Sequence, residues 1–350
     1  MSKRIGVAVL GATGMVGQYF VNLTANHPWF ELKAVVASDR SAGKSYADAC
    51  RWLVSADIPD AVRGLTVLPL GAELDAHIVF SALPSDVAGE VEAEYAKRGH
   101  FVFSNASSHR MDPLVPLLIP EVNHEHSAIL REQQRQRGWS GFIVTNPNCC
   151  AAVLVTALDP LHKAFGLDKV MVTTLQAVSG AGYPGLPSLD ILDNAIPYIG
   201  GEEPKLESEP LKMLGRYADN EIHSAGFTMS AHCNRVATRD GHLECVSAAL
   251  SSPATLDDVA EAFRTYTSLP QELGLPTAPE HPVILRTEPN RPQTRLDRDA
   301  GNGMSVSVGR IRECPIHGVK FVALGSNIMR GAAGGSVLNA ELLKAQGLVD

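Results

Sequence analysis

The sequence has no long apolar run and is short of positive charge. No stretch of the 350 residues approaches the roughly 18 to 20 consecutive apolar residues of a membrane span. Met1 is followed almost at once by a predicted strand, which leaves no room for a signal peptide. The net charge is −8, whereas nucleic-acid binding requires a basic face. We therefore expect neither a membrane nor a nucleic-acid partner.

Cysteine is also sparse, with six residues at positions 50, 149, 150, 233, 245 and 314. They are too few for a disulfide scaffold, and their spacing matches no zinc site. His124 and His126 are two positions apart and would not share a helix face, so no metal is predicted. These features favour a cytoplasmic protein, and the length predicts about two domains.

The first half of the chain has the pattern of a nucleotide-binding domain. A buried-strand pattern at residues 5–10 enters Gly11-Ala12-Thr13-Gly14-Met15-Val16-Gly17, and a helical pattern follows to about residue 26. Glycines at every third position are a variant of the dinucleotide fingerprint, which allows a tight turn, close approach to a pyrophosphate and helix packing. The alternative is a simple tight turn. The predicted cofactor contacts here are Gly11, Thr13, Gly14, Met15 and Val16.

The end of the second predicted strand, at residues 32–37, bears on the choice between NAD and NADP. An acidic side chain there binds the ribose 2′-hydroxyl of NAD, whereas the 2′-phosphate of NADP favours basic and hydroxyl groups. Asp39 keeps NAD open, but it is outweighed by Ser38, Arg40, Ser41 and Lys44. We therefore predict NADP, the alternative being a solvated turn. Ser81 ends a further strand and is also predicted to contact the cofactor, because ligands gather at the carboxyl ends of such strands.

A candidate nucleophile lies in Thr145-Asn146-Pro147-Asn148-Cys149-Cys150, between a strand pattern at 142–144 and a helical pattern at 151–165. A thiol just before a helix lies where backbone N–H groups and the helix dipole favour negative charge. That environment lowers the thiol pKa from about 8.5, and the thiolate is the reactive form. We therefore predict that Cys149 is a catalytic nucleophile.

The second half predicts a mixed or antiparallel sheet with helices. A strand at 170–178 carries Gln176 and ends in a glycine-rich loop that either approaches a ligand or merely turns. Thr238-Arg239-Asp240-Gly241 is predicted to be a hairpin turn between strands at 227–236 and 243–250, which would place Arg235 and His242 around one pocket. A histidine can act as acid and base, so His242 is the natural partner of Cys149. The charged segment 202–214, taken alone, predicts a surface helix with local ion pairs.

Several long motifs together resemble those of the aspartate-β-semialdehyde dehydrogenases, in the branch shared by archaea, fungi and some bacteria. They run along the whole chain: GATGMVG, ASDRSAGKSY, SNASSHRMD, PLLIPEVN, TNPNCC, LQAVSGAGYPG, ESEPLK, HCNRVATRDGH and RGAAGGS. The resemblance implies an α/β fold with a Rossmann-like doubly wound sheet and an α+β catalytic and dimerisation domain of the glyceraldehyde-phosphate dehydrogenase type. It implies an NADP-binding domain of residues 1–147 plus 327–350, a catalytic domain of residues 148–326, and a homodimer or homotetramer.

The resemblance also assigns roles residue by residue. Cys149 matches the nucleophile, His242 the acid/base and Gln176 the glutamine beside the thiol. Substrate binding is implied for Arg235 at the α-carboxylate, Glu209 at the amino group, Arg110 and Lys212 at the phosphate, and Asn148. This replaces the surface-helix interpretation of Glu209 and Lys212. Further cofactor contacts are implied for Ser179, Gly180, Gly182 and Asn327.

One position departs from the family pattern. Relatives usually carry Ser or Thr after the nucleophile, and this chain has Cys150. If the helix starts there, Cys150 should point away into packing, which leaves Cys149 as the nucleophile.

The implied reaction is NADPH-dependent reduction of L-aspartyl-4-phosphate to L-aspartate-4-semialdehyde with release of phosphate, a step toward lysine, diaminopimelate, threonine and methionine. A malonyl-CoA reductase-like thioester reductase is the first alternative. N-acetyl-glutamyl-phosphate reductase shares the chemistry but matches the motifs less well, and an NADP-binding regulatory protein would not need the full set of reactive residues.

Overall fold

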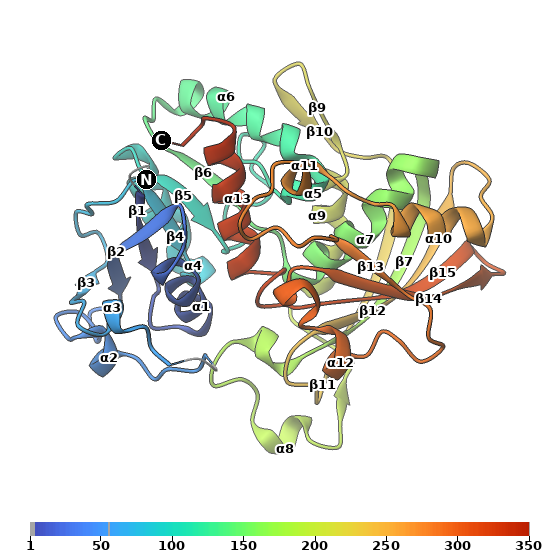
Figure 1. Ribbon diagram of the computed structural model, residues 1–350, viewed down its shortest axis with the longest axis horizontal. Helices are drawn as coiled ribbons and strands as arrows, with labels where there is room; N and C mark the ends of the chain where they lie inside the picture. Colours follow the sequence, from blue (N-terminus) through green and yellow to red (C-terminus); the bar gives the residue numbers. More distant parts are fainter. Residues whose placement is uncertain (1–3, 55–56, 350) are drawn as a thin grey trace.

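The computed structural model describes residues 4–54 and 57–349, and within them it contains two large sheets, each covered by its own helices, and one small two-stranded sheet (Figure 1). The first sheet is parallel, with the order β3-β2-β1-β4-β5-β6. Its strands are β1 (Ile5–Leu10), β2 (Phe30–Ala37), β3 (Val67–Pro69), β4 (Ile78–Ser81), β5 (Phe101–Ser104) and β6 (Phe142–Thr145).

The first sheet is a doubly wound one because its connections are crossover helices. The long ones are α1 (Met15–Ala25), α4 (Ser85–Lys97) and α6 (Ile129–Arg137). The last helix of the chain, α13 (Ala333–Ala345), packs against α1 and shares its apolar core, so the C-terminal segment returns to this sheet. The strands are apolar and buried on both faces, as expected of a parallel sheet between helices. The predicted doubly wound sheet is confirmed.

The second sheet is mixed and has the order β13-β14-β15-β12-β7-β11-β8 in the described part of the chain. Its strands are β7 (Leu167–Gln176), β8 (Ala195–Ile196), β11 (Thr228–Val236), β12 (His242–Leu250), β13 (Val283–Arg286), β14 (Val306–Cys314) and β15 (Gly318–Gly325). The predicted hairpin between β11 and β12 is wrong, because β7 lies between them, parallel to β11 and antiparallel to β12. The segment 237–241 therefore crosses the end of β7, where Val178 and Ser179 donate to the carbonyls of Thr238 and Arg239.

Shorter elements connect and flank these two sheets. They are α2 (Tyr46–Ala49), α3 (Asp60–Arg63), α5 (Pro120–Asn123), η1 (His124–Ala128), η2 (Val178–Ala181), α8 (Ser188–Ile191), α9 (Glu202–Met213), β9 (Arg216–Ala218), β10 (Glu221–His223), α10 (Leu256–Arg264), α11 (Leu269–Glu272), α12 (Thr294–Asp297) and η3 (Ala300–Gly303). Within the described ranges, no helix is both long and apolar enough to cross a membrane.

The helix that positions the chemistry is α7 (Cys149–Phe165), which packs between α9, α10 and the second sheet. The side chain of Asn148 caps its N-terminus by accepting hydrogen bonds from the backbone N–H groups of Cys150 and Ala151, at 2.9 and 3.2 Å. Residues 150–161 of α7 are buried, and many of them belong to the main apolar core of this half. Its first turn is therefore held rigidly at the junction of the two halves.

Candidate active site

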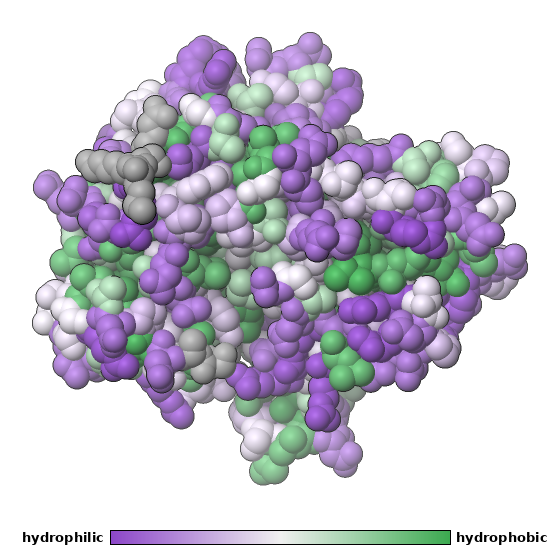
Figure 2. All heavy atoms as spheres, viewed as in Figure 1, coloured by the Kyte–Doolittle hydropathy of each residue, from purple (hydrophilic) through white to green (hydrophobic). Residues whose placement is uncertain are grey.

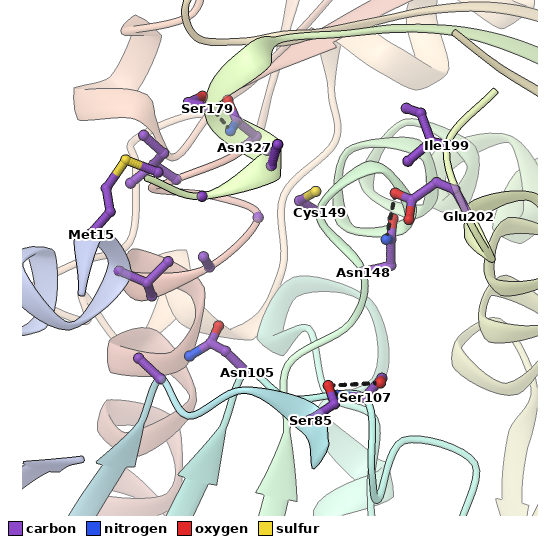
Figure 3. A pocket seen from close by; sticks show the side chains of 18 of the residues that line it. Met15, Ser85, Asn105, Ser107, Asn148, Cys149, Ser179, Ile199, Glu202 and Asn327 are labelled. Atoms are coloured by element: carbon purple, nitrogen blue, oxygen red, sulfur yellow. Dashed lines mark hydrogen bonds between the residues drawn. The ribbon is translucent and has the colours of Figure 1, made fainter. Parts of the chain in front are cut away.

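A cavity of about 620 Å³ runs between the two halves of the molecule. One wall is the start of α1 and the loop after β5, and the other is the start of α7 with η2 and α9 (Figure 3). Cys149 lies between these walls, with Met15 and Asn105 on one side and Asn148 and Glu202 on the other (Figure 3). The cavity therefore joins the predicted cofactor loop to the predicted nucleophile.

The α1 end of the cavity is suited to an anion. Gly14 caps α1 without any side-chain hydrogen bond, and the first turn contains no acidic residue. Its free N–H groups and helix dipole therefore favour a bound phosphate. Gly11 has φ +71°, and a Cβ there would lie 2.7 Å from the carbonyl oxygen of Ala82. Only glycine fits this turn, and Gly14, Met15 and Val16 line the cavity.

The turn after β2 lies at the same edge of the sheet but outside this cavity. Ser38, Asp39 and Arg40 are exposed, and the N–H of Ser41 closes the turn on the carbonyl of Ser38 at 2.8 Å. This turn is next to the α1 loop, because the N–H of Ala12 donates to Val36 at the end of β2. Its exposed hydroxyl and guanidinium groups can reach a cofactor that extends beyond the cavity. Thr13 does not line the cavity, and its carbonyl accepts a hydrogen bond from Gln18.

Ser81 does not fit the predicted cofactor contact. Its side chain is fully buried, and its hydroxyl lies against the carboxyl of Glu92 on α4. Successive side chains of a strand point to opposite faces, and the one at 81 faces the helix layer. The end of β4 instead reaches the cavity through Ala82 and Ser85.

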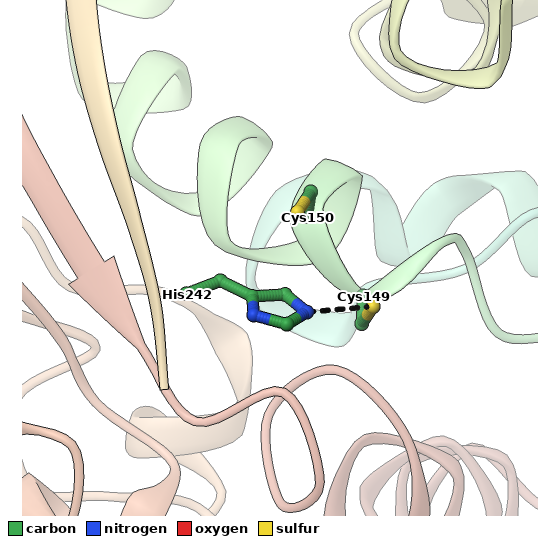
Figure 4. A group of neighbouring side chains, drawn as sticks. All are labelled: Cys149, Cys150 and His242. Carbon is green, nitrogen blue, oxygen red and sulfur yellow. Dashed lines mark hydrogen bonds between the residues drawn. The ribbon is translucent and has the colours of Figure 1, made fainter. Parts of the chain in front are cut away.

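Cys149 and His242 form a close pair, although 93 positions separate them. The Sγ of Cys149 lies 3.2 Å from the Nε2 of His242 (Figure 4). The other ring nitrogen, Nδ1, accepts a hydrogen bond from the backbone N–H of Ala177 at 3.1 Å. Because Nδ1 is an acceptor, the ring proton belongs on Nε2, where it points at the sulfur.

The surroundings of Cys149 favour its thiolate. The adjacent Cys150 thiol, and then the neighbouring His242 and Arg110, hold the pKa of Cys149 well below its usual value despite the opposing effect of burial. The start of α7 adds its dipole. Cys149 is partly buried and lines the cavity, so a ligand can reach it.

Arg235 and His242 reach the site through Ala177 instead of across a hairpin. Arg235 pairs with Gln176 in the β11–β7 register, and its Nη1 donates to the carbonyl of Ala177 at 2.7 Å. The N–H of the same residue, Ala177, donates to His242 Nδ1. Arg235 lines the cavity, whereas Gln176 is buried and donates to Thr174 at 3.2 Å. A Cβ on Gly180 would lie 2.7 Å from the Arg235 guanidinium, so the glycine-rich loop approaches the site closely.

Glu209 and Lys212 lie behind the cavity and do not line it. Glu209 is buried and binds Arg110 Nη1 at 2.9 Å and the N–H of Asn148 at 2.6 Å. Lys212 donates to three backbone carbonyls, those of Arg110, Asp112 and Val115, at 2.7 to 2.8 Å. All three of its protons are thus used within the protein. The structure gives these two residues a role in positioning the Arg110 loop and Asn148.

The pair that faces the cavity is Glu202 and Lys205, which the sequence analysis missed. Glu202 accepts a hydrogen bond from the Asn148 side chain at 2.7 Å (Figure 3), and Lys205 lies 3.5 Å from its other oxygen. Glu202/Lys205 and Glu209/Lys212 have the same spacing on α9 and are shifted by two helical turns, so both pairs lie on one face. The charge pattern could have found both pairs, but not which of them faces the cavity.

The remaining predicted residues are brought together around the sulfur. Arg110 and Asn148 line the cavity, as do Ser179, Gly180, Gly182 and Asn327. Asn327 ties the loops together, since its amide group donates to Ser179 Oγ at 2.9 Å and accepts from the N–H of Gly241 at 2.8 Å. Gly331 lies directly against Cys149, because a Cβ there would come within 2.6 Å of the Cys149 Cβ.

The fold and this geometry define a class: two-domain dehydrogenases in which a nucleotide-binding sheet presents a cofactor to a cysteine nucleophile. Residues 6–129 match the model of the semialdehyde dehydrogenase NAD binding domain, and residues 158–330 match that of the semialdehyde dehydrogenase dimerisation domain. The chain therefore has the two functional parts of that class.

Similarity to individual proteins is high over the whole length. The chain is 52% identical over 341 residues to an aspartate-semialdehyde dehydrogenase of Archaeoglobus fulgidus, covering 97% of this chain and 98% of that protein. It superposes on a crystal structure of the Candida albicans aspartate-semialdehyde dehydrogenase with NADP at a TM-score of 0.92, with 41% identity and coverage of 99% and 100%. A malonyl-CoA reductase (NADP) of Metallosphaera sedula is 41% identical over 357 residues, covering 100% of this chain and 99% of that protein. The chain belongs to the aspartate-semialdehyde dehydrogenase family.

Proposed function

We propose that this enzyme reduces L-aspartyl-4-phosphate to L-aspartate-4-semialdehyde with NADPH and releases inorganic phosphate. The observation that carries the proposal is the reactive pair, with Cys149 Sγ 3.2 Å from His242 Nε2 at the start of a helix, in a cavity that also holds Arg110 and Arg235. A thiolate there can take up an acyl group while the two arginines bind the anionic ends of its donor.

The substrate fits the charges that line the cavity. Arg235 is the proposed partner of the α-carboxylate, and Glu202 that of the α-amino group. Arg110 and Lys205 are the proposed partners of the acyl phosphate. These roles replace those predicted for Glu209 and Lys212, whose polar atoms are bound to the protein itself.

NADP fits the other end of the same cavity. The uncapped α1 N-terminus would hold the pyrophosphate, and Ser38, Arg40 and Ser41 the 2′-phosphate. Loop residues Ser179, Gly180 and Asn327 would border the nicotinamide end, next to Cys149. When bound, the cofactor supplies the hydride that reduces the acyl group to the aldehyde level.

The chain's own residues carry the covalent steps. The Cys149 thiolate attacks the acyl carbon, and the carbon–oxygen bond to phosphate breaks to leave a thioester and free phosphate. The Nε2–H of His242 points at the sulfur and is placed to exchange a proton with the oxygen on the sulfur-bound carbon. Splitting one displacement into two steps lowers each barrier, and such acid–base help contributes on the order of 100- to 10,000-fold.

One assay separates this reaction from the thioester alternative. Phosphate-dependent reduction of NADP with aspartate semialdehyde should proceed, and oxidation of NADPH with malonyl-CoA should not. Activity with malonyl-CoA alone would contradict the proposal and favour the reductase-like enzyme, which the Metallosphaera sedula relative makes the second candidate.

A matched pair of lysine variants tests the substrate assignment. Lys205→Met should raise the KM for phosphate by about tenfold or more, because it removes a cation from the cavity. Lys212→Met should lower thermal stability, because it leaves three buried carbonyls without their donor. Steady-state kinetics and thermal melts of both variants are compared. The assignment is wrong if the Lys205 variant binds phosphate normally.

The remaining proposals concern assembly, location and domain limits. The chain carries a family dimerisation domain, and we propose a homodimer or homotetramer. Exposed apolar side chains support this, since Leu189, Leu192 and Tyr198 in and after α8 are 90%, 62% and 72% exposed. Figure 2 shows apolar surface on the projection at the foot of the molecule, where Figure 1 places α8. We place the enzyme in the cytoplasm, where a reducing environment keeps a thiol nucleophile active. We also keep the division into residues 1–147 plus 327–350 and residues 148–326.

A further inference from the structure

A contact between the two halves of the molecule lies beside the cofactor end of the cavity. Nη1 of Arg51 donates a hydrogen bond to the hydroxyl of Tyr183, and the guanidinium carbon lies 5.1 Å from the centre of the Tyr183 ring. Arg51 belongs to the segment after α2, and Tyr183 to the segment between η2 and α8. In Figure 1 these two segments meet below α1. The contact therefore joins the nucleotide-binding half to the catalytic half, and neither residue has a part in the covalent steps proposed above.

The Arg51 side of this contact is tied to the glycine-rich turn at the start of α1. The side chain of Gln18, on α1, is fully buried. Its amide nitrogen donates to the carbonyls of Thr13 and Arg51, both at 2.9 Å, and its oxygen accepts from the N–H of Leu53 at 2.7 Å. One buried side chain thus fixes the segment of Arg51 to the turn that is proposed to hold the pyrophosphate.

The Tyr183 side is an exposed loop between two cavities. Tyr183 lines both the 620 Å³ cavity and a neighbouring one of about 290 Å³, and the two cavities share Met15, Ser179 and Gly182. Gly182 and Gly185 have φ +73° and +83°. A Cβ on Gly182 would meet no atom of the other described residues within 4 Å, its chain neighbours aside, so packing around this loop is loose. The contact with the other half therefore holds the tyrosine ring in place.

We propose that Arg51 and Tyr183 form a latch, a contact that keeps the two cofactor-binding loops together over bound NADP and slows its release. Each half supplies one of these loops, with Gly14 and Met15 in the first and Ser179 in the second. NADP that contacts both loops leaves when they separate, and their separation breaks the latch. The inference rests on the cofactor position proposed above. Both latch residues are positioning residues, because they act through the loops and not on the reacting atoms.

A different role for Arg51 would be to attract the anionic cofactor from solution. Attraction by a charge raises the association rate and weakens as salt is added, whereas a latch lowers the dissociation rate. Tyr183→Phe separates the two roles, since it removes the hydroxyl of the latch and leaves the charge of Arg51 unchanged. The rates of binding and release therefore carry the test, rather than affinity alone.

The test is stopped-flow fluorescence of NADPH bound to the full-length protein, with release followed after a chase of excess NADP. Arg51→Met should raise the dissociation rate by about tenfold, because the hydrogen bond and the contact with the ring are both lost. Tyr183→Phe should raise it by about threefold, because the ring contact remains. The double variant should release NADPH no faster than Arg51→Met, since both changes break one contact.

Arg63→Met is the matched control. Arg63 is a half-exposed arginine of the same half and pairs with Asp60 on α3, so its loss removes the same charge and leaves the latch intact. The control should release NADPH at the native rate. An unchanged dissociation rate in Arg51→Met, multiplicative effects in the double variant, or an effect confined to association would overturn the latch. A native protein that does not bind NADPH would contradict the proposed function itself, and this outcome is distinct from the others.

Discussion

Two helices point their N-termini at the same cavity, and they use that position in opposite ways. The start of α1 has no capping side chain and no acidic residue, so its N–H groups are free for a bound anion. The start of α7 is capped by Asn148 and carries Cys149 as its first residue, whose pKa is lowered, so it favours a thiolate of its own. One dipole is thus open to a bound ligand and the other favours a charged side chain, and the local cap makes the difference.

Removing the Cys149 thiol at the start of α7 should have the largest effect on activity. Cys149→Ala should reduce turnover by more than about 1,000-fold, because no acyl acceptor remains. It should leave NADP binding intact, since α1 is unchanged. Turnover assays and calorimetric NADP titration measure the two effects. Native turnover in this variant would disprove the covalent mechanism.

A carboxylate placed at the start of α1 should weaken the binding of an anionic cofactor there. Gly14 has φ −76° and ψ 164°, which any residue can adopt, so Gly14→Asp adds a charged cap without backbone strain, although its Cβ would lie a close 3.3 Å from the carbonyl oxygen of Gly11. The carboxylate should occupy the free N–H groups and repel the pyrophosphate, weakening NADP binding by about 100-fold, or about 2.7 kcal/mol. Gly14→Asn, an uncharged cap of the same size, is the matched control. Equal losses in the two variants would show that charge is not the cause.

The stability of the nucleotide-binding half should depend on pH because of one buried carboxyl group. Burial raises the pKa of Glu92 to about 7. Because the folded-state pKa is raised, its stabilising contribution is complete below about pH 4.5 and is lost as pH rises through 7. The native protein should therefore lose about 2 kcal/mol of stability from this group between pH 5 and pH 7. Glu92→Gln should remove that loss. Denaturant unfolding at pH 5 and pH 7 measures the free energy of unfolding of both proteins. An equal change in this free energy between the two pH values would contradict the prediction.

Removing the cap of α7 should have the smallest effect. Asn148→Ala deletes the bonds to the N–H groups of Cys150 and Ala151 and should cost about 1 kcal/mol of unfolding free energy. Asn148→Ser keeps a capping oxygen without placing a second carboxylate against Glu202, and should recover part of that stability. Thermal melts compare the two, and a stable alanine variant would mean that packing alone holds the start of α7.

The first sheet and its helices could be predicted from the chain because their signals are local. A buried apolar strand, the glycines of residues 11–17 and a following helical pattern each lie within a few residues of one another. The position of α7 was likewise predicted closely, since a helical pattern was expected at 151–165 and the helix spans Cys149–Phe165. These features depend on neighbours along the chain, so a local pattern is enough.

Long-range pairing could not be predicted in the same way. Asp240-Gly241 is a strong hairpin signal, but β7 contacts both β11 and β12 over most of their lengths and separates them. Similarly, the spacing of charges on α9 is the same at 202/205 and at 209/212, and only tertiary packing decides that the first pair faces the cavity. The missed residues are those whose role depends on which turn of a helix the rest of the protein places at the cavity.

The contact of Gly331 with Cys149 ties the start of α7 to the C-terminal end of the chain. Cys149 lies in the middle of the sequence, but the backbone beside it comes from residue 331, just before the last helix. Arg330 fixes that segment through a buried pair with Glu121, at 2.6 and 2.8 Å. A truncation that ended the chain before residue 330 would therefore remove one side of the cavity while leaving Cys149 and His242 in place in the sequence.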